Sequence, residues 1–528
     1  MFEKIKIYMR SKDKVYIYMN EEILFFENQE LSSILENLRE ESETDEEMAV
    51  SVILHYPYFL FEEDLQDKNN FINKNMKYIY KKYYLNHMEN RYVNLYMERK
   101  QINDIKNSCR QAGFKLMDIK TDFDIIYGFS KEEDVEILQV GEINSIRILV
   151  KNEKIEDYKN ALIIPGLIDM HLHAPQFSFR GLGMDMELLD WLNTYTFPEE
   201  TKYKNMDYAK KAYPKFVKAL TNSFTTRAVI FSTLHKEATV LLMDMLEKTG
   251  LKCFVGKVNM DRNSSGELIE TTSESIDATR EWLNTCKNRY KNTKPIITPR
   301  FIPSCSDELM KELGEIRGDT YGLQSHLSEN PKEVEWVRDL CPDSDGYLDA
   351  YDKRGCLNKS DIGTVMAHCV YSDEKEMELL KKRNVYVAHC PQSNICLSSG
   401  IAPIRKFLDR GIKVGLGSDI AAGYSLNILN QAVEAIGLSK LYWRYIDSNS
   451  KPLELAEAFA MATRNSGSYF GNIGAFEEGF EADILVIDDE ALNDGVDDIR
   501  KRFERFLYLS DECSLISKYV AGEKIIIS

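Results

Sequence analysis

Two histidines, His171 and His173, stand one residue apart directly behind the apolar run ALIIPGLIDM (161–170). Successive side chains of an extended chain point to opposite faces, so residues i and i+2 share one face. If residues 161–170 form a buried strand, both imidazoles converge at its end, which is typical of a metal site. A His-rich surface turn is the alternative, and the spacing alone does not decide between them.

Polar and aromatic side chains also stand near the carboxyl ends of later β-rich runs. These residues are Arg300, Phe301, His326, Glu329, His368, His389 and Asp419. Together with His171 and His173, five of the eight histidines of the chain therefore lie at the same end of the predicted strands. Each histidine alone could be a hydrogen-bonded core residue, but together they favour a metal centre.

One ligand set suits zinc: three imidazoles, from His171, His173 and His326, and the carboxylate of Asp419, with room left for a water molecule. Zinc lowers the pKa of a bound water to about 7, which makes hydroxide available at neutral pH. Hydrolysis also needs a proton carrier, and Glu329 follows His326 by three residues. The alternative for Glu329 is a carboxylate that the helix dipole stabilises at a helix N-terminus. Iron accepts the same ligands, so the sequence leaves both metals open.

The elements that must position these residues alternate between strand and helix from residue 161 onward. The β-rich runs are 161–170, 225–233, 252–260, 294–303, 321–329, 362–370, 385–393 and 413–421. Helical patterns at 237–250, 273–290 and 374–383 separate some of them. Eight such strands predict an α/β fold of the (β/α)8 TIM barrel type, whose active site lies at the carboxyl ends of the strands. A doubly wound open sheet is the alternative, but no G-x-G-x-x-G phosphate loop frames a strand-to-helix turn.

Longer stretches of the chain resemble the guanine deaminase family of the amidohydrolase superfamily. They are HLHAPQFSFRGLGMDMELLDWLNTYTFPEE (171–200), TTRAVIFSTLHKEAT (225–239), TPRFIPSCS (298–306), HCPQSNICLSSG (389–400) and GLGSDIAAGYS (415–425). The resemblance covers about residues 160 to 528. The H-x-H pair is typical of the whole superfamily, whereas the APQ, LLDWLNTYTFP and PRF segments are far more specific.

The resemblance implies hydrolytic deamination of guanine to xanthine and ammonia, with one zinc ion per chain. It implies that the four residues named above are the metal ligands and that Glu329 is the proton shuttle. His368 would contact the attacking water or the departing group, and Asp419 would help to position the water. Family members commonly pair as homodimers, so the resemblance implies a homodimer here as well.

The resemblance also implies a purine-binding set made of Gln176, Arg300 and Phe301, beside His326 and Glu329. An amide and a guanidinium can read the carbonyl oxygen and ring nitrogens of guanine, while a phenyl ring packs on the flat base. Without the resemblance, Arg300 would be interpreted as a salt bridge at the barrel rim and Phe301 as core packing.

Two other functions stay open at this point. A related amidohydrolase could act on another amino- or chloro-substituted heterocycle, and the chain could be a non-catalytic interaction protein or an impaired fusion that keeps the barrel as a scaffold. Comparing the turnover of guanine with that of other heterocycles distinguishes a guanine deaminase from a related amidohydrolase. Measuring the metal content distinguishes an enzyme from a non-catalytic scaffold.

The chain is expected to contain four regions. An N-terminal α+β region of unknown role is predicted at 1–122, a partial β-sandwich or linker at 123–162, the barrel at 163–470, and the C-terminal strands of a small accessory β-sandwich at 471–528. Residues 123–160 offer only an incomplete set of strands for the first half of that sandwich. Residues 5–19 alternate like a hairpin with KDK at its turn.

Composition narrows the class of partners. The net charge of −18 and the pI of about 5.1 argue against binding to nucleic acid or to anionic membranes. No apolar run approaches the roughly 20 residues that span a bilayer, and no secretory signal is visible at the N-terminus. Ten cysteines without a regular framework are expected to be reduced thiols of a cytoplasmic protein.

Overall fold

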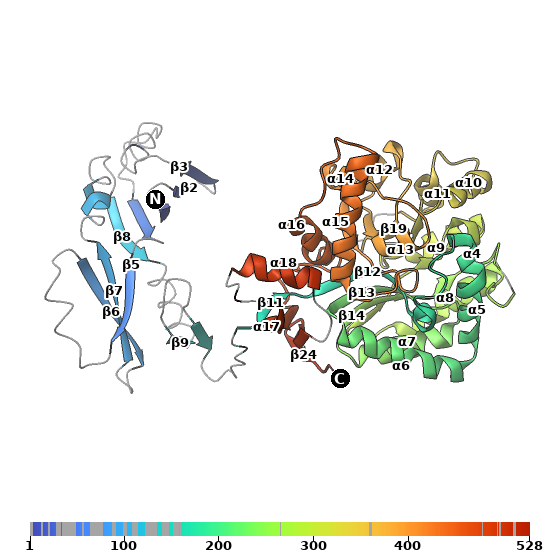
Figure 1. Cartoon of the computed structure of the whole chain (residues 1–528), viewed down its shortest axis with the longest axis horizontal. Helices are drawn as coiled ribbons and strands as arrows, with labels where there is room; N and C mark the ends of the chain where they lie inside the picture. The colour runs from blue at the N-terminus through green and yellow to red at the C-terminus, as the bar shows by residue number, and fades with distance from the viewer. Residues whose placement is uncertain are drawn as a thin grey trace. The chain divides into compact units, whose positions relative to one another are not determined.

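The computed structural model describes residues 158 and 160–527, except 265, 358–361, 478, 494, 496–497 and 510–513; before these it describes strands β1 to β10, residue 33 and residues 103–107. The chain divides into two compact units, Met1–Asp157 and Tyr158–Ser528. Figure 1 shows both, with the N-terminal unit in blue. The boundaries predicted at 122, 162 and 470 stay a prediction.

Parallel strands form the barrel of the second unit. In barrel order they are β12 (Leu167–His173), β13 (Thr225–Phe231), β14 (Lys252–Gly256) with β15 (Val258–Asn259), β16 (Thr293–Pro295) with β17 (Thr298–Pro299), β18 (Leu323–Leu327), β19 (Thr364–His368), β20 (Tyr386–His389) and β21 (Lys413–Leu416). The amide of Gln324 donates to the carbonyl of Ile297 (2.9 Å) and joins β18 to the fourth strand position. The amide of Asp419 donates to the carbonyl of His171 (2.8 Å) and closes the ring between β21 and β12. The predicted (β/α)8 barrel is therefore confirmed.

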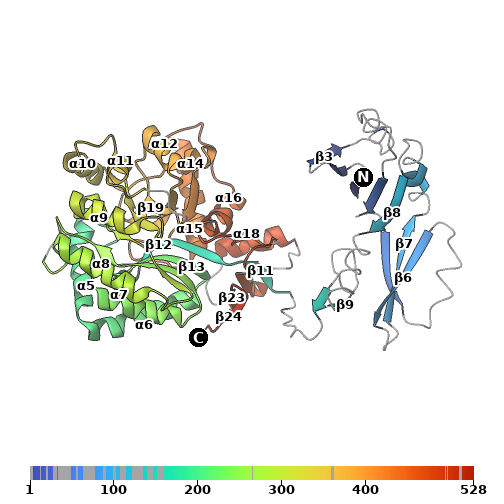
Figure 2. The ribbon, with the colours of Figure 1, turned by 180° about the vertical axis from the view of Figure 1, so that it is seen from behind.

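Helices surround these strands on the outside, as Figure 2 shows for α6, α7 and α8. The longer ones are α6 (Met206–Asn222), α7 (Lys236–Glu247), α8 (Thr272–Cys286), α9 (Asp307–Arg317), α10 (Pro331–Leu340), α11 (Tyr347–Lys353), α12 (Glu374–Lys382) and α15 (Ile428–Tyr445). Shorter ones are α4 (Leu188–Trp191), α5 (Phe197–Thr201), α13 (Pro391–Cys396), α14 (Ile404–Asp409) and α16 (Leu455–Ala460). Every residue of β13, β18, β19 and β20 is buried, as expected for parallel strands that are covered on both faces.

The first predicted strand is in fact two strands that belong to different sheets. β11 (Leu162–Pro165) pairs antiparallel with β22 (Ile484–Ile487) in an accessory sheet, and β12 begins the barrel at Leu167. Gly166 separates them, and a Cβ atom there would lie 2.5 Å from the side chain of Thr226. The barrel strand continues through His173, so both histidines lie within the strand rather than behind it.

The accessory sheet has the strand order β11-β22-β23-β24, with β23 at Leu515–Val520 and β24 at Glu523–Ile525. A buried ion pair fastens it to the barrel, because Arg227 of β13 donates from Nε to Oδ2 of Asp483 (2.7 Å) and from Nη2 to Oδ1 (2.8 Å). The ammonium of Lys518 donates to the carbonyl of Thr225 (2.9 Å) from the same sheet. Two helices, α17 (Glu490–Asn493) and α18 (Ile499–Leu509), connect β22 to β23.

The described residues of the N-terminal unit form three sheets, with the orders β3-β2-β1-β4-β8, β5-β7-β6 and β10-β9. Their strands are β1 (Lys4–Ser11), β2 (Lys14–Met19), β3 (Glu22–Glu27), β4 (Ala49–Leu54), β5 (Tyr58–Glu63), β6 (Tyr78–Asn86), β7 (Arg91–Glu98), β8 (Lys115–Thr121), β9 (Val135–Gln139) and β10 (Arg147–Val150). The antiparallel pairing of β1 with β2 confirms the hairpin predicted at 5–19. Most of the predicted half-sandwich at 123–160 lies outside the described residues.

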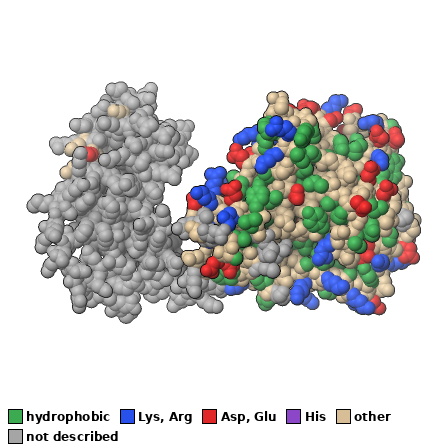
Figure 3. All heavy atoms as spheres, in the orientation of Figure 1, with side chains coloured by type: hydrophobic (Ala, Val, Ile, Leu, Met, Phe, Trp, Pro, Cys, Tyr) green, Lys and Arg blue, Asp and Glu red, His purple; other side chains and the backbone are tan. Residues whose placement is uncertain are grey.

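The described surface of the second unit mixes acidic and basic side chains, as Figure 3 shows. Among the described residues, no helix is both long enough and apolar enough to cross a membrane. The eight cysteines in the described part of the chain are free thiols, and all except Cys396 are buried.

Candidate active site

Four side chains bring a nitrogen or oxygen atom to one point at the carboxyl end of the barrel. Nε2 of His173 lies 3.2 Å from Nε2 of His326. Oδ1 of Asp419 lies 3.2 Å from Nε2 of His171 and 3.4 Å from Nε2 of His173. Two ligands of one tetrahedral zinc ion, each about 2.0–2.1 Å from the metal, are roughly 3.3 Å apart. These three separations match the spacing of ligands around a single ion.

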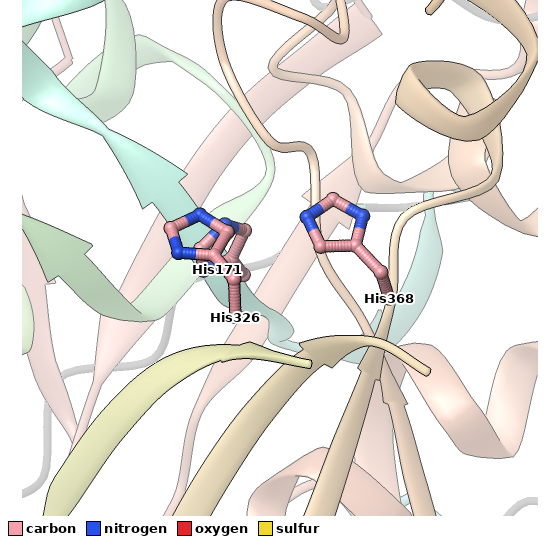
Figure 4. Close-up of side chains that lie close together, drawn as sticks. All are labelled: His171, His326 and His368. Atoms are coloured by element: carbon pink, nitrogen blue, oxygen red, sulfur yellow. The ribbon is translucent and has the colours of Figure 1, made fainter. Parts of the chain in front are cut away.

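A further histidine, His368, extends from the end of β19 toward the same space as His171 of β12 and His326 of β18 (Figure 4). Its ring centroid lies 5.5 Å from that of His326. Nε2 of His368 is 3.7 Å from Oδ2 of Asp419, whereas His171 and His173 contact Oδ1. His368 is thus placed beside the cluster, where it can contact a group bound to it.

A sulfur atom also comes near, since Cys390, His368 and Asp419 could together hold an ion. Burial raises the pKa of the Cys390 thiol well above its ordinary value, and the charge of Asp419 adds to the effect. A protonated thiol is a poor metal ligand. The imidazole and carboxylate set is therefore the better site.

The imidazole tautomers are fixed by hydrogen bonds on the far side of two rings. Nδ1 of His326 lies 2.7 Å from the carbonyl oxygen of Arg300 and donates to it, so Nε2 carries the lone pair. Nδ1 of His368 donates in the same way to Oδ1 of Asn394 (3.0 Å). Nε2 of His368 is buried without a hydrogen-bond partner among the described residues. Its lone pair is available to a cation or to a bound water molecule.

The strand ends that carry the site adopt a backbone that side chains rarely take. The φ angles are 48° at Ser328, 73° at His368 and 47° at Asp419. Such positions cost about 1–3 kcal/mol each and persist where surrounding contacts fix them. Asp169 stabilises the backbone at the ends of β12 and β21, because its Oδ1 accepts hydrogen bonds from the amides of His171 (3.2 Å) and Ser418 (2.9 Å).

The electrostatics of the site keep each group in the form that binds a metal. Burial lowers the pKa of His173 to about 4 and the pKa values of His171 and His326 below the ordinary range, so the rings are neutral. Burial acts to raise the pKa of Asp419, but the close contacts with His171 and His173 bring it well below its usual value. Asp419 is therefore a carboxylate.

The carboxyl group of Glu329 faces the cluster without joining it. Its Oε2 lies 3.4 Å from Nε2 of His368, and its Oε1 accepts a hydrogen bond from Oγ of Ser399 (3.3 Å). Burial, together with the charge of Asp419, raises the pKa of Glu329 well above its ordinary value. A buried carboxyl group with a raised pKa next to a hydrolytic centre is suited to carrying a proton.

The backbone of Glu329 is held by a second buried carboxylate. Oε2 of Glu333 accepts hydrogen bonds from the amides of Glu329 (2.9 Å) and Asn330 (3.2 Å). Oε1 of Glu333 accepts from the hydroxyl of Tyr347 (2.6 Å). Glu333 forms the capping box of α10 with Asn330, so the helix start and the proton carrier share one support.

A cavity opens beside the cluster and brings the predicted purine contacts together. Its lining includes His173, Gln176, Leu188, Trp191, Leu192, Arg300, Phe301, His326, Glu329, Glu333, His368, Leu397, Asp419 and Ala422. All three predicted contacts, Gln176, Arg300 and Phe301, lie in it. Eight of these residues are polar or ionisable and six are apolar, so polar groups converge beside apolar walls, as in small-molecule sites.

One acidic residue of the site was missed by the sequence reasoning. Oε1 of Glu200 accepts from Nε2 of Gln176 (2.9 Å), and Oε2 accepts from Nη1 of Arg300 (2.6 Å). Glu200 lies in α5, 100 residues from Arg300 in the chain, so no local spacing pointed to the pair. His389, in contrast, follows the predicted strand end but lines a different cavity.

The fold and the site define a class of protein, the metal-dependent hydrolases with a (β/α)8 barrel. In agreement, the profile of the family described as "Amidohydrolase family" matches residues 162–523. This family is metal-dependent, which agrees with the convergent imidazoles and carboxylate.

Individual relatives narrow the class. The chain is 39% identical over 385 residues to the guanine deaminase of Dictyostelium discoideum, and the aligned residues cover 71% of this chain and 85% of that protein. It is 39% identical over 379 residues to the human guanine deaminase, covering 69% of this chain and 82% of the relative. A crystal structure of guanine deaminase from C. acetobutylicum with guanine bound in its active site superposes with a TM-score of 0.70 and 43% identity, covering 74% of this chain and 95% of that one. The chain belongs to the amidohydrolase family and, within it, to the guanine deaminases.

Proposed function

We propose that this chain hydrolyses guanine to xanthine and ammonia in the cavity beside the histidine cluster. One observation carries the proposal: Gln176, Arg300 and Phe301 line the same cavity as His326, Glu329 and Asp419. The 43% identity to a deaminase that holds guanine in its active site supports the choice of substrate.

The ligands proposed for one zinc ion are His171, His173, His326 and Asp419. When bound there, zinc supplies a water molecule whose pKa is lowered to about 7. The neutral imidazoles and the ionised carboxylate need lose no proton to accept the ion, which favours binding at neutral pH. The same ligand atoms also bind iron, so the choice of zinc over iron is itself part of the proposal.

The proton traffic is assigned to Glu329. Its carboxylate takes a proton from the attacking water and delivers it to N3 of guanine as the new C–O bond forms at C2. Glu329 then moves the remaining hydroxyl proton of the tetrahedral centre to the 2-amino group, the C2–N bond breaks as the C2=O bond forms, and ammonia leaves. The raised pKa of Glu329 suits this work, because a weaker acid is a better base toward water.

His368 and Asp419 position the reacting groups. Nε2 of His368 is 3.4 Å from Glu329 and 3.7 Å from Asp419, so it can donate to or accept from a group between the two carboxyls. Asn394 holds the ring through Nδ1 (3.0 Å) and leaves Nε2 for this contact.

Substrate recognition is assigned to the other end of the cavity. Arg300 and Gln176 present N–H donors to oxygen and nitrogen acceptors of the base, and Phe301 packs on its face. We also propose, from family resemblance, that two copies of the chain pair as a homodimer.

Turnover of several heterocycles by the purified full-length chain tests the substrate. We expect ammonia release from guanine and at least a hundredfold lower kcat/KM with adenine, a pterin or a chlorinated triazine. Ammonia release from one of the others, without turnover of guanine, would instead support the related hydrolase.

A further inference from the structure

The carboxylate of Glu200 is the common anchor of the two polar residues that face the proposed substrate. It is buried, with 2% of its surface exposed, and it accepts one hydrogen bond from Gln176 (2.9 Å) and one from Arg300 (2.6 Å). Arg300 and Gln176 are themselves 3% and 2% exposed. A buried carboxylate between two donors is an arrangement that leaves neither side chain free to turn.

The orientation of the Gln176 amide follows from its two hydrogen bonds. Its Nε2 donates to Glu200, and its Oε1 accepts from the amide of Ala421 (3.2 Å). Exchanging the oxygen and nitrogen would place an oxygen against the carboxylate and an N–H against the Ala421 N–H. Both contacts would be repulsive, so the second N–H of Nε2 is held as a donor.

The guanidinium of Arg300 is fixed in the same way. Its Nη1 is bound to Glu200, and its Cζ lies 5.4 Å from the ring centroid of Phe197, which is in α5 with Glu200. A guanidinium has five N–H donors and no acceptor. Arg300 and Gln176 therefore offer N–H donors to the base, because the one acceptor between them, Oε1 of Gln176, already accepts from the amide of Ala421.

We propose that Glu200 is the positioning residue that sets specificity for an oxo-purine over an amino-purine. A donor-only pair satisfies a carbonyl oxygen and an unprotonated ring nitrogen of the base. An amino group at the same place would bring its N–H against the N–H groups of the protein and leave buried donors without acceptors. Unpaired buried donors cost binding free energy, so an amino-purine would bind more weakly. The inference rests on the proposed function in that it places a purine in this cavity.

The test compares binding of two purines that lack the 2-amino group, hypoxanthine and adenine, to the full-length chain by calorimetry. Neither needs to be turned over, so the measurement is independent of catalysis. In E200Q the new amide must place its own N–H₂ against Gln176 or Arg300, so the donor pair loses its fixed orientation.

Glu199 offers a matched control one residue away. Its carboxylate is bound by Ser178 (2.6 Å) and Lys202 (2.7 Å) and by the Tyr208 hydroxyl, with no hydrogen bond to Gln176 or Arg300 among those found in the described residues. E199Q makes the same chemical change in the same short helix. Its effect measures what a local loss of charge and packing does by itself.

We expect the wild-type chain to prefer hypoxanthine over adenine, E200Q to reduce the ratio of the two affinities at least tenfold, and E199Q to leave it within twofold. The inference is overturned if the wild type shows no preference, or if E200Q weakens both purines by the same factor. Metal content and the melting temperature of E200Q identify a variant that has failed to fold, and in that case E200D, which keeps the charge, must restore the ratio for the inference to stand. A wild type that prefers hypoxanthine but releases no ammonia from guanine would refute the proposed function and leave this inference in place.

Discussion

Nε2 of His173 lies 3.2 Å from Nε2 of His326, although 153 positions separate the two residues in the chain. The ring of His326 donates from Nδ1 to the Arg300 carbonyl, so its Nε2 presents a lone pair. Burial lowers the pKa of both rings, so at neutral pH each ring is neutral and keeps one proton, which in His326 is on Nδ1. The lone pair on Nε2 of His326 can therefore accept a hydrogen bond from His173 or bind a cation that the two rings share.

Removing one of these rings should remove the metal. We expect H326A to bind less than a tenth of the zinc that the wild type binds and to lose at least 10³-fold in kcat/KM for guanine. H235A is the control, because His235 precedes α7 and lies outside the cluster. Metal analysis of the two purified variants checks this, and full zinc occupancy in H326A would contradict the ligand assignment.

Much of the site could be predicted because its residues lie at strand ends. His171, His173, His326 and His368 each follow or end a β-rich run, and a barrel brings such ends together whatever their distance in sequence. The prediction that residues 161–170 form one strand was wrong, because these residues belong to two different sheets. The chain changes sheet at Gly166, where it passes close to Thr226, and this contact is not visible in the sequence.

The supports of the site could not be predicted in the same way. Glu200 contacts Gln176 and Arg300 across segments that are distant in the sequence. The spacing of the three residues does not predict these contacts. The hydrogen bond from the amide of Glu329 to Glu333 likewise depends on the turn at the end of β18. Side-chain contacts of this kind depend on tertiary packing, which a strand and helix pattern does not specify.

Replacing the proton carrier should separate chemistry from metal binding. We expect E329Q to lower kcat for guanine by about 10²–10⁴-fold, the usual contribution of general acid–base catalysis, with zinc content unchanged. E335Q changes an exposed glutamate on α10 and should retain the wild-type rate. Steady-state kinetics with both variants decides the matter, and a near-wild-type kcat for E329Q would remove Glu329 from the mechanism.

The attachment of the accessory sheet should be costly to break. The side chains of Arg227 and Asp483 are 3% and 0% exposed. Removing one partner of a buried ion pair typically costs about 3–5 kcal/mol, since the other charge stays buried. We expect D483N to lower the free energy of unfolding by up to this amount in urea titration, because Arg227 keeps only its pair with the half-exposed Glu481 (2.8 Å). E477Q, which breaks the exposed pair with Arg464, should change it little; equal effects would argue against the role of the buried pair.

Stability should rise with pH above neutrality because of Lys518. Burial lowers the pKa of Lys518 to about 7 from an ordinary value of 10.5. Between these two values the unfolded chain binds one more proton than the folded chain, so raising the pH favours folding by up to about 1.4 kcal/mol per unit. Below pH 7 both states are protonated and the contribution is constant.

The variant K518M isolates this titration. Methionine cannot be protonated, so we expect the difference in unfolding free energy between wild type and K518M to change between pH 7 and pH 9.5 in favour of the wild type. Urea titrations at each pH measure it. A difference that does not vary with pH would show that Lys518 does not titrate in this range.

The most direct measurement is guanine deamination by the metal-free chain as zinc is added back in known amounts. Four ligands converging on one point predict that the rate of xanthine and ammonia formation rises linearly and levels off at one zinc per chain. A chain that deaminates guanine at full rate without metal, or that stays inactive when one zinc is bound, would contradict the account.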